Sequence, residues 1–201
     1  MLMSRPVVLA SGSPTRLAML RSAGIDPIVA AVRIDEQAIR AALQSEGVPP
    51  KDIAGHLADL KAQRAAVRHP DAWIIAADQV LDIDGEAVGK PTDRTSAHAQ
   101  LGRLSGAQHR LHSAVVVYEG AQPVWRHVGQ ARLTMRQLSD PVITAYLDHI
   151  GDEAYETAGS YRIEGYGIRL FKRVDGDHFT ILGMPLLPLI DYLMLRQIIA
   201  P

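Results

Sequence analysis

Residues 73–78 read WIIAAD, a short continuous apolar run that ends in an acid. Such a run is typical of a strand that is buried on both faces, as in the sheet of an α/β protein. A carboxylate at its end would be costly to desolvate without a partner. Because ligands of open α/β sheets bind beyond the carboxyl ends of strands, Asp78 is a candidate functional residue, with a structural hydrogen-bond acceptor as the alternative.

Strands and helices alternate on both sides of this run. Pro6–Ala10 is expected to be a buried strand, and Ser13-Pro14 suits the start of a helix that ends near Ala23, before Gly24. Further strands are expected at Pro27–Arg33, Val80–Ile83, Leu111–Tyr118 and Val124–Met135. Pro49-Pro50 separates two helical stretches, of which the second is Lys51–Arg68, and further helices are expected at Asp93–Leu104, Ser139–Ile150 and Pro185–Ile199. The three glycines of Gly159–Gly167 predict a hinge or ligand loop.

This order of elements predicts the fold class. We expect an α/β fold with a mixed, twisted sheet flanked by helices, forming two lobes around a central cleft. No low-complexity tract or repeat divides the chain, so we expect a single domain over residues 1–201.

The composition excludes several kinds of protein. The 201 residues include no cysteine, which excludes disulfide frameworks, cysteine-ligated zinc, iron–sulfur clusters and thiol nucleophiles. The 21 basic and 22 acidic residues show no bias toward nucleic acid or membranes. No targeting segment is visible at the start, and no stretch reaches about 18 apolar residues, so the expectation is a cytoplasmic protein without a membrane span.

The segment Ser11-Gly12-Ser13-Pro14-Thr15-Arg16 lies between a predicted strand and a predicted helix. Free backbone N–H groups and the helix dipole make such a junction an anion site, to which Ser11 adds a hydroxyl and Arg16 a positive charge. The alternative is an ordinary capped helix.

Other charged residues have a structural and a functional interpretation. Lys90, in GEAVGKPTD (85–93), is fixed between Gly89 and Pro91, which favours a phosphate-binding charge; the spacing excludes a P-loop. Taken alone, Glu36 is typical of a solvated loop and Lys61 of a basic helix face. His109 and His112 lie on a strand-like segment with no acid near them in the sequence, and no histidine shows metal-ligand spacing.

Eight short motifs together carry a family resemblance. In chain order they are S-G-S-P-x-R (11–16), I-D-E (34–36), L-K-A (60–62), A-A-D-Q (76–79), G-K-P (89–91), L-S-G-x-x-H (104–109), A-G-S-Y-R-I-E-G-Y-G (158–167) and G-M-P-L (183–186). Each motif is weak singly, but their order resembles the Maf family of nucleotide pyrophosphatases from Leu9 to about Leu187.

The resemblance implies an enzyme that hydrolyses nucleoside triphosphates to the monophosphate and pyrophosphate with a divalent metal. Such an activity would remove modified or surplus nucleotides. The site residues that it implies are Ser11 and Arg16 for phosphate binding, Glu36, Lys61 and Lys90 in catalysis, and Asp78 as the proton acceptor. Glu36 and Asp78 would hold Mg²⁺ or Mn²⁺ through oxygen ligands.

Three positions divide the substrate groups of the family, and here they hold Thr15, Gln79 and Glu164. The thymidine and uridine triphosphate group typically has Arg, Thr and Gln there, and the 7-methyl-GTP group has Trp, Gln and Glu. The chain matches the second group at two of the three positions. A carboxylate at Glu164 can accept hydrogen bonds from a guanine edge and would balance a methylated ring, whereas Thr15 cannot stack on a base.

Other functions compete with this one. The family name is linked to septum formation, so a nucleotide-binding regulator of cell division is one alternative, and a pyrophosphatase that prefers dTTP or UTP is another. A nucleic-acid-binding protein is disfavoured by the near-neutral charge and the few aromatic residues. The resemblance also implies a homodimer.

Overall fold

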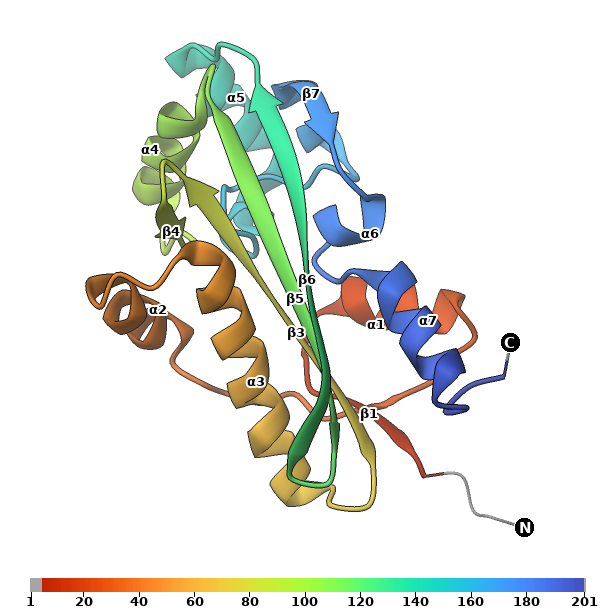
Figure 1. Cartoon of the computed structure of the whole chain (residues 1–201). Coiled ribbons are helices and arrows are strands. Elements are labelled where there is room, and N and C mark those ends of the chain that lie inside the picture. Colours follow the sequence, from red (N-terminus) through yellow and green to blue (C-terminus); the bar gives the residue numbers. More distant parts are fainter. Residues whose placement is uncertain (1–4, 201) are drawn as a thin grey trace.

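The computed structural model describes residues 5–200, which form a twisted seven-stranded mixed sheet flanked by helices (Figure 1). The strand order is β2-β1-β3-β5-β6-β7, and the short β4 pairs with β3. β1 is parallel to β2 and β3, and the other pairings are antiparallel. The strands are β1 (Val7–Leu9), β2 (Ile28–Val29), β3 (Trp73–Ile83), β4 (Glu86–Val88), β5 (Gln108–Glu119), β6 (Gln122–Met135) and β7 (Phe171–Asp175).

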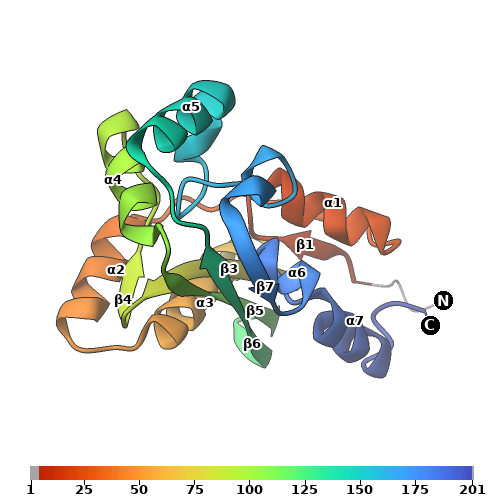
Figure 2. The same ribbon diagram turned by 90° about the horizontal axis from the view of Figure 1, so that it is seen from above.

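The helices cover both faces of the sheet and its far end (Figures 1 and 2). They are α1 (Pro14–Ser22), α2 (Glu36–Ser45), α3 (Pro50–Arg68), α4 (Arg94–Leu104), α5 (Asp140–Ile150), α6 (His178–Ile181) and α7 (Leu186–Leu195), with 3₁₀ turns at Gly151–Tyr155 and Tyr166–Leu170. No helix in residues 5–200 has the length and apolar character needed to span a bilayer.

β3 is buried on both faces, which explains its continuous apolar run. Ile74 and Ala76 pack with α3 on one face, and Ile75 and Ala77 pack with α1 and α7 on the other. Successive side chains of a strand point to opposite faces, so both sets must be apolar. A third apolar cluster joins α4 and α5 to the far ends of β3, β5 and β6. The predicted α/β class with a mixed sheet is therefore confirmed.

Several boundaries differ from those predicted. Trp73–Asp78 and Val80–Ile83 are a single strand, because the backbone of Asp78 pairs with Ala114 without interruption. Asp78 therefore lies in the middle of β3 and not beyond its end, so that part of the prediction was wrong. The strand expected at Pro27–Arg33 is only two residues long, and α7 ends at Leu195 instead of Ile199. The sequence analysis missed β4, β7 and α6, which are too short to show a period.

Candidate active site

A lysine and two carboxylates form the centre of the candidate site. The side chain of Asp78 points to the α3 face of the sheet, where the Lys61 Nζ lies 2.5 Å from its Oδ1 and 2.6 Å from the Glu36 Oε1. Asp78 and Lys61 are only 4% and 6% exposed. Glu36 is the first residue of α2, whose N-terminus is capped by the side chain of Asp35. Three consecutive elements, α2, α3 and β3, thus bring opposite charges into contact.

The burial of this centre changes the pKa values of its groups. Burial raises the pKa of Asp78 above its usual value, although Lys61 and Arg16 act in the opposite direction. At Glu36 burial also acts to raise the pKa, but Lys61, with Lys90 and Arg16, holds the net pKa below its usual value. The two carboxyl groups therefore differ in basicity, and Asp78 is the stronger proton acceptor.

Arg16 connects the first motif to this centre. Its Nη1 donates to the Ala77 carbonyl at 2.8 Å and to the Ser11 Oγ at 3.3 Å, and its Nε donates to the Gly183 carbonyl at 2.9 Å. Ser13 caps α1 by accepting from the Arg16 N–H. The junction is thus a capped helix, and the same segment also directs a positive charge toward Asp78.

A cavity of about 710 Å³ brings these groups together. Its lining includes all six residues that the sequence analysis assigned to phosphate binding and catalysis, namely Ser11, Arg16, Glu36, Lys61, Asp78 and Lys90. The far wall of the cavity is the loop 155–164. The cavity thus lies between this late loop and the six charged or polar residues, which agrees with the predicted central cleft. Four cations and two carboxylates on one wall suit a polyanionic ligand: Arg16, Arg40, Lys61 and Lys90 against Glu36 and Asp78.

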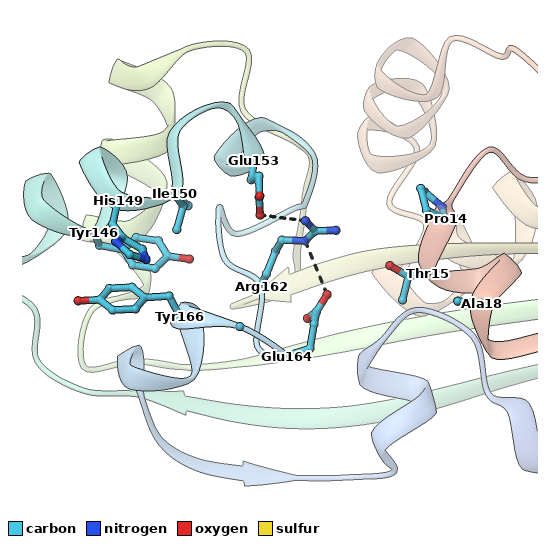
Figure 3. Close-up of a pocket in the computed structure, with 12 residues that line it drawn as sticks. Pro14, Thr15, Ala18, Tyr146, His149, Ile150, Glu153, Arg162, Glu164 and Tyr166 are labelled. Atoms are coloured by element: carbon cyan, nitrogen blue, oxygen red, sulfur yellow. Dashed lines mark hydrogen bonds and ion pairs between the residues drawn. The ribbon is translucent and has the colours of Figure 1, made fainter. Parts of the chain in front are cut away.

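The three predicted specificity residues, Thr15, Gln79 and Glu164, all line the larger cavity. Thr15 and Glu164 also line a second pocket of about 590 Å³, which adjoins the first and is shown in Figure 3. Gln79 lines only the larger cavity. Its Nε2 donates to the Ser113 Oγ and to the Thr180 and Ile181 carbonyls, so this amide nitrogen joins β3, β5 and α6.

The structure also shows residues that the sequence analysis did not select. Arg40, a half-buried residue of α2, lines the larger cavity. Arg162 lines both cavities and pairs with Glu153 at 2.9 Å. Arg40 carries no motif signal, whereas Arg162 lies within the quoted A-G-S-Y-R-I-E-G-Y-G motif and could have been selected from it.

Tertiary packing gives each of the two histidines a partner that is distant in the sequence. His112 Nε2 lies 3.0 Å from the Asp82 Oδ2, an acid that is thirty residues earlier in the sequence and adjacent in the sheet. His109 Nε2 lies 2.7 Å from the Tyr161 hydroxyl, and burial lowers the pKa of His109 to about 4. Both histidines are therefore packed inside the protein, with His109 fixing the base of the late loop.

Glu36 and Asp78 are the acidic side chains that could hold a divalent metal here. Within residues 5–200, no group of three or more His, Cys, Asp or Glu side chains is arranged to hold a metal ion by itself. Two carboxylates still suit Mg²⁺, which is commonly held by one or two carboxylates, water and phosphate oxygens. The donor type therefore fits an ion that binds together with a phosphate ligand.

Comparison with known proteins identifies the family. The family model described as Maf-like protein matches residues 6–196. The chain belongs to the Maf-like protein family. A curated relative of this Maf-like protein, the nucleoside triphosphate pyrophosphatase of Ruegeria pomeroyi, is 46% identical over 98% of the chain and 99% of its own length. The 7-methyl-GTP pyrophosphatase of Brucella abortus is 44% identical over 94% of each chain.

The likeness of this Maf-like protein to two solved structures is weaker than its likeness to these relatives. A HAM1 protein from Coxiella burnetii aligns with a TM-score of 0.45 and 18% identity, over 65% of this chain and 73% of that chain. At this level the likeness adds nothing to the family assignment.

Proposed function

We propose that this protein is a nucleoside triphosphate pyrophosphatase that hydrolyses its substrate to the monophosphate and pyrophosphate. The observation that carries the proposal is a buried carboxylate, Asp78, paired with Lys61 in a cavity lined by further cations. Relatives that bear this name match the chain over almost its full length. The six motif residues of the family lie in one cavity, which is the arrangement that such chemistry needs.

The chemistry follows from the charges. With its raised pKa, the Asp78 carboxylate would accept a proton from a water molecule that attacks the α-phosphorus. A new P–O bond forms to the water oxygen, the α–β anhydride bond breaks, and the electron pair leaves with pyrophosphate. Arg16, Lys61 and Lys90 would balance the charge that develops on the phosphate oxygens. Positioning and electrostatics supply most of the catalysis in phosphoryl-type transfers.

We also propose that Glu36 and Asp78 bind Mg²⁺ or Mn²⁺ together with the substrate. When bound, the ion would supply Lewis-acid polarisation of the phosphates. Lys61 contacts both carboxylates and holds them in place for this role.

For the base we propose a modified guanine such as that of 7-methyl-GTP. Relatives named 7-methyl-GTP pyrophosphatase support this choice. The Glu164 carboxylate, in the second pocket that adjoins the larger cavity, supports it as well. A preference for dTTP or UTP is the second candidate. Cytoplasmic residence, a homodimer, and no nucleic-acid or membrane partner stay predictions of the sequence analysis.

The test is a panel of 7-methyl-GTP, GTP, dTTP and UTP with Mg²⁺ or Mn²⁺, in which release of pyrophosphate and monophosphate is measured. Asp78→Asn should lower turnover by about a hundredfold or more while the protein stays folded. Asp84→Asn is the matched control, because Asp84 lies on an exposed turn at positive φ, which asparagine also adopts. No turnover of any nucleotide by the wild type contradicts the proposal, and would favour a regulator that binds nucleotides.

A further inference from the structure

Arg40 is a cation of the larger cavity whose charge no neighbouring side chain balances. It is half-buried in α2 and lines the cavity, and its guanidinium forms no ion pair and no hydrogen bond with any part of residues 5–200. All five N–H donors of this guanidinium are therefore available to a ligand. A positive charge that is partly withdrawn from water is favoured where an anion binds beside it.

Two contacts on either side of Arg40 fix the position of α2. Glu36, Arg40 and Gln44 follow at intervals of four residues, so they lie on one face of the helix in successive turns. Glu36 contacts the Lys61 Nζ at 2.6 Å, and the Gln44 Oε1 accepts from the Ala87 N–H at 2.8 Å. α2 is thus attached to α3 at one end and to β4 at the other (Figures 1 and 2).

The Arg40 guanidinium lies against Gly89, the residue before Lys90. A Cβ at Gly89 would overlap the guanidinium, so the missing side chain leaves the room that Arg40 occupies. The φ of Gly89 is not positive, so the backbone itself does not require glycine there. From the other side, the Gln100 Nε2 holds the Gly89 carbonyl at 2.7 Å. Arg40 and Lys90 thus supply their charges to the cavity at the same turn.

This turn lies away from the reacting centre. Lys61 contacts Asp78 directly, whereas Arg40 contacts the turn that follows β4. The last residue of β4, Val88, pairs with Leu81, which is three residues, or about 10 Å, further along β3 than Asp78. The cavity therefore has positive charge beside Asp78 and a second group of cations beyond it.

We propose that Arg40 binds the terminal phosphate of the substrate and, after the reaction, the pyrophosphate that leaves. This inference rests on the proposed function and adds a residue to it. With the α-phosphorus beside Asp78 and the base in the second pocket, the β- and γ-phosphates extend toward the turn of Arg40 and Lys90. A guanidinium presents parallel N–H donors that match the oxygens of a phosphate group.

The contact also acts during the reaction. When the α–β anhydride bond breaks, the electron pair passes to the leaving pyrophosphate, whose negative charge increases. The attraction between Arg40 and this group is then stronger in the transition state than in the bound substrate, so its loss should lower kcat as well as kcat/KM.

The first experiment measures inhibition by the two products. In Arg40→Gln the inhibition constant of pyrophosphate should rise by about tenfold, whereas that of the nucleoside monophosphate should stay unchanged, because only pyrophosphate carries the terminal phosphate. Arg40→Lys keeps the charge and should keep most of the affinity for pyrophosphate. Arg68→Gln, at an exposed arginine that ends α3 outside both cavities, is the matched control and should change neither constant.

Two results of this experiment overturn the proposal. An equal rise of both inhibition constants in Arg40→Gln would place the guanidinium at the α-phosphate. If neither constant changes and only the unfolding midpoint falls, Arg40 serves the packing of α2 against the turn of Gly89.

The second experiment uses Gly89→Ala, which leaves Arg40 in the chain but places a methyl group where its guanidinium lies. This variant should weaken inhibition by pyrophosphate about as much as Arg40→Gln does. In the Arg40→Gln background it should add little, because glutamine is shorter than arginine and does not reach this space. Full inhibition by pyrophosphate in Gly89→Ala would overturn the proposal, since the ligand would then not depend on the guanidinium in this position.

A binding measurement separates this proposal from the proposed function. The dissociation constant of pyrophosphate, measured by calorimetry with Mg²⁺, needs no turnover. Hydrolysis of triphosphates with equal pyrophosphate binding in wild type and Arg40→Gln would leave the function intact and overturn the role of Arg40. Pyrophosphate binding that depends on Arg40, without hydrolysis of any triphosphate, would support that role and overturn the function. A wild type that does not bind pyrophosphate overturns the role of Arg40.

Discussion

Lys61 lies between the buried Asp78 and the partly exposed Glu36, and its ammonium group compensates the negative charge of both carboxylates. A buried ion pair of this kind adds little to stability relative to an apolar replacement, but it is costly to break from one side. Asp78 depends on Lys61 most, because Asp78 is almost completely buried and burial alone raises its pKa. The lysine therefore controls the fraction of Asp78 that is ionised.

Lys61→Met is predicted to move the acidic limb of the pH–kcat/KM profile to higher pH. The active form needs ionised Asp78, so activity falls as pH drops through the pKa of that group, and loss of the ammonium raises this pKa further. The free energy of unfolding at neutral pH should fall by roughly 3 kcal/mol. Lys51→Met, at an exposed position of the same helix, should change neither quantity. A profile that keeps its acidic limb would show that Asp78 is not the group that titrates.

At the scale of elements, α4 connects two loops of the site. The Gln100 Nε2 donates to the Gly89 carbonyl at 2.7 Å, and the Gln100 Oε1 accepts from the Gly159 N–H at 2.8 Å. Gly89 precedes Lys90, and Gly159 begins the loop that carries Arg162 and Glu164. Gly159 has a φ of 86°, and a Cβ at this position would lie 2.5 Å from the Tyr161 ring. Only glycine therefore fits the start of this loop.

Gln100→Glu is predicted to lower kcat/KM by about fivefold or more. Glutamate can still accept the hydrogen bond from the Gly159 N–H, but it has no donor for the Gly89 carbonyl. The substitution therefore removes the hydrogen bond that holds the turn before Lys90 and keeps the one to the late loop. The same substitution in a Lys90→Ala background should have little further effect. Additive losses in the double variant would instead show that Gln100 does not act through Lys90.

At the scale of the whole molecule, three long strands join both halves of the core, and His109 is buried where they meet the late loop. The pKa of His109 in the fold is about 4, below its ordinary value of 6.5. As pH falls from 6.5 toward 4, the unfolded chain binds a proton that the folded chain does not. The stability that this residue contributes is therefore complete above pH 6.5 and is lost across that window.

Chemical denaturation at pH 7 and pH 4 tests this linkage. His109 alone should lower the free energy of unfolding by about 3 kcal/mol between these two pH values. His109→Gln keeps a hydrogen-bonding side chain that does not titrate. In this variant the fall in the free energy of unfolding from pH 7 to pH 4 should be about 3 kcal/mol smaller than in the wild type. His56→Gln, at an exposed position of α3, should retain the decrease of the wild type. An equal pH dependence in all three proteins would contradict the burial of a neutral His109.

The long elements were predictable because their patterns are local. Proline, glycine and capping residues mark the ends of α1, α3, α4 and α5, and the apolar runs mark β3, β5 and β6. β4, β7 and α6 have three to five residues each, and their formation depends on pairing and packing with distant segments. Asp78 was placed at a strand end for a similar reason, since the sequence does not show that Ala114 pairs beside it.

The sequence by itself determined the fold class and the residues that meet at Asp78, because apolar periodicity, turn residues and ordered motifs are properties of the chain. Tertiary structure alone decided which partners these residues have. It placed Lys61 between two acids, used the amide nitrogen of Gln79 to join three elements, and put Arg162 beside Glu153. Distances, burial and shared charge arise only when distant segments pack together, so no local pattern contains them.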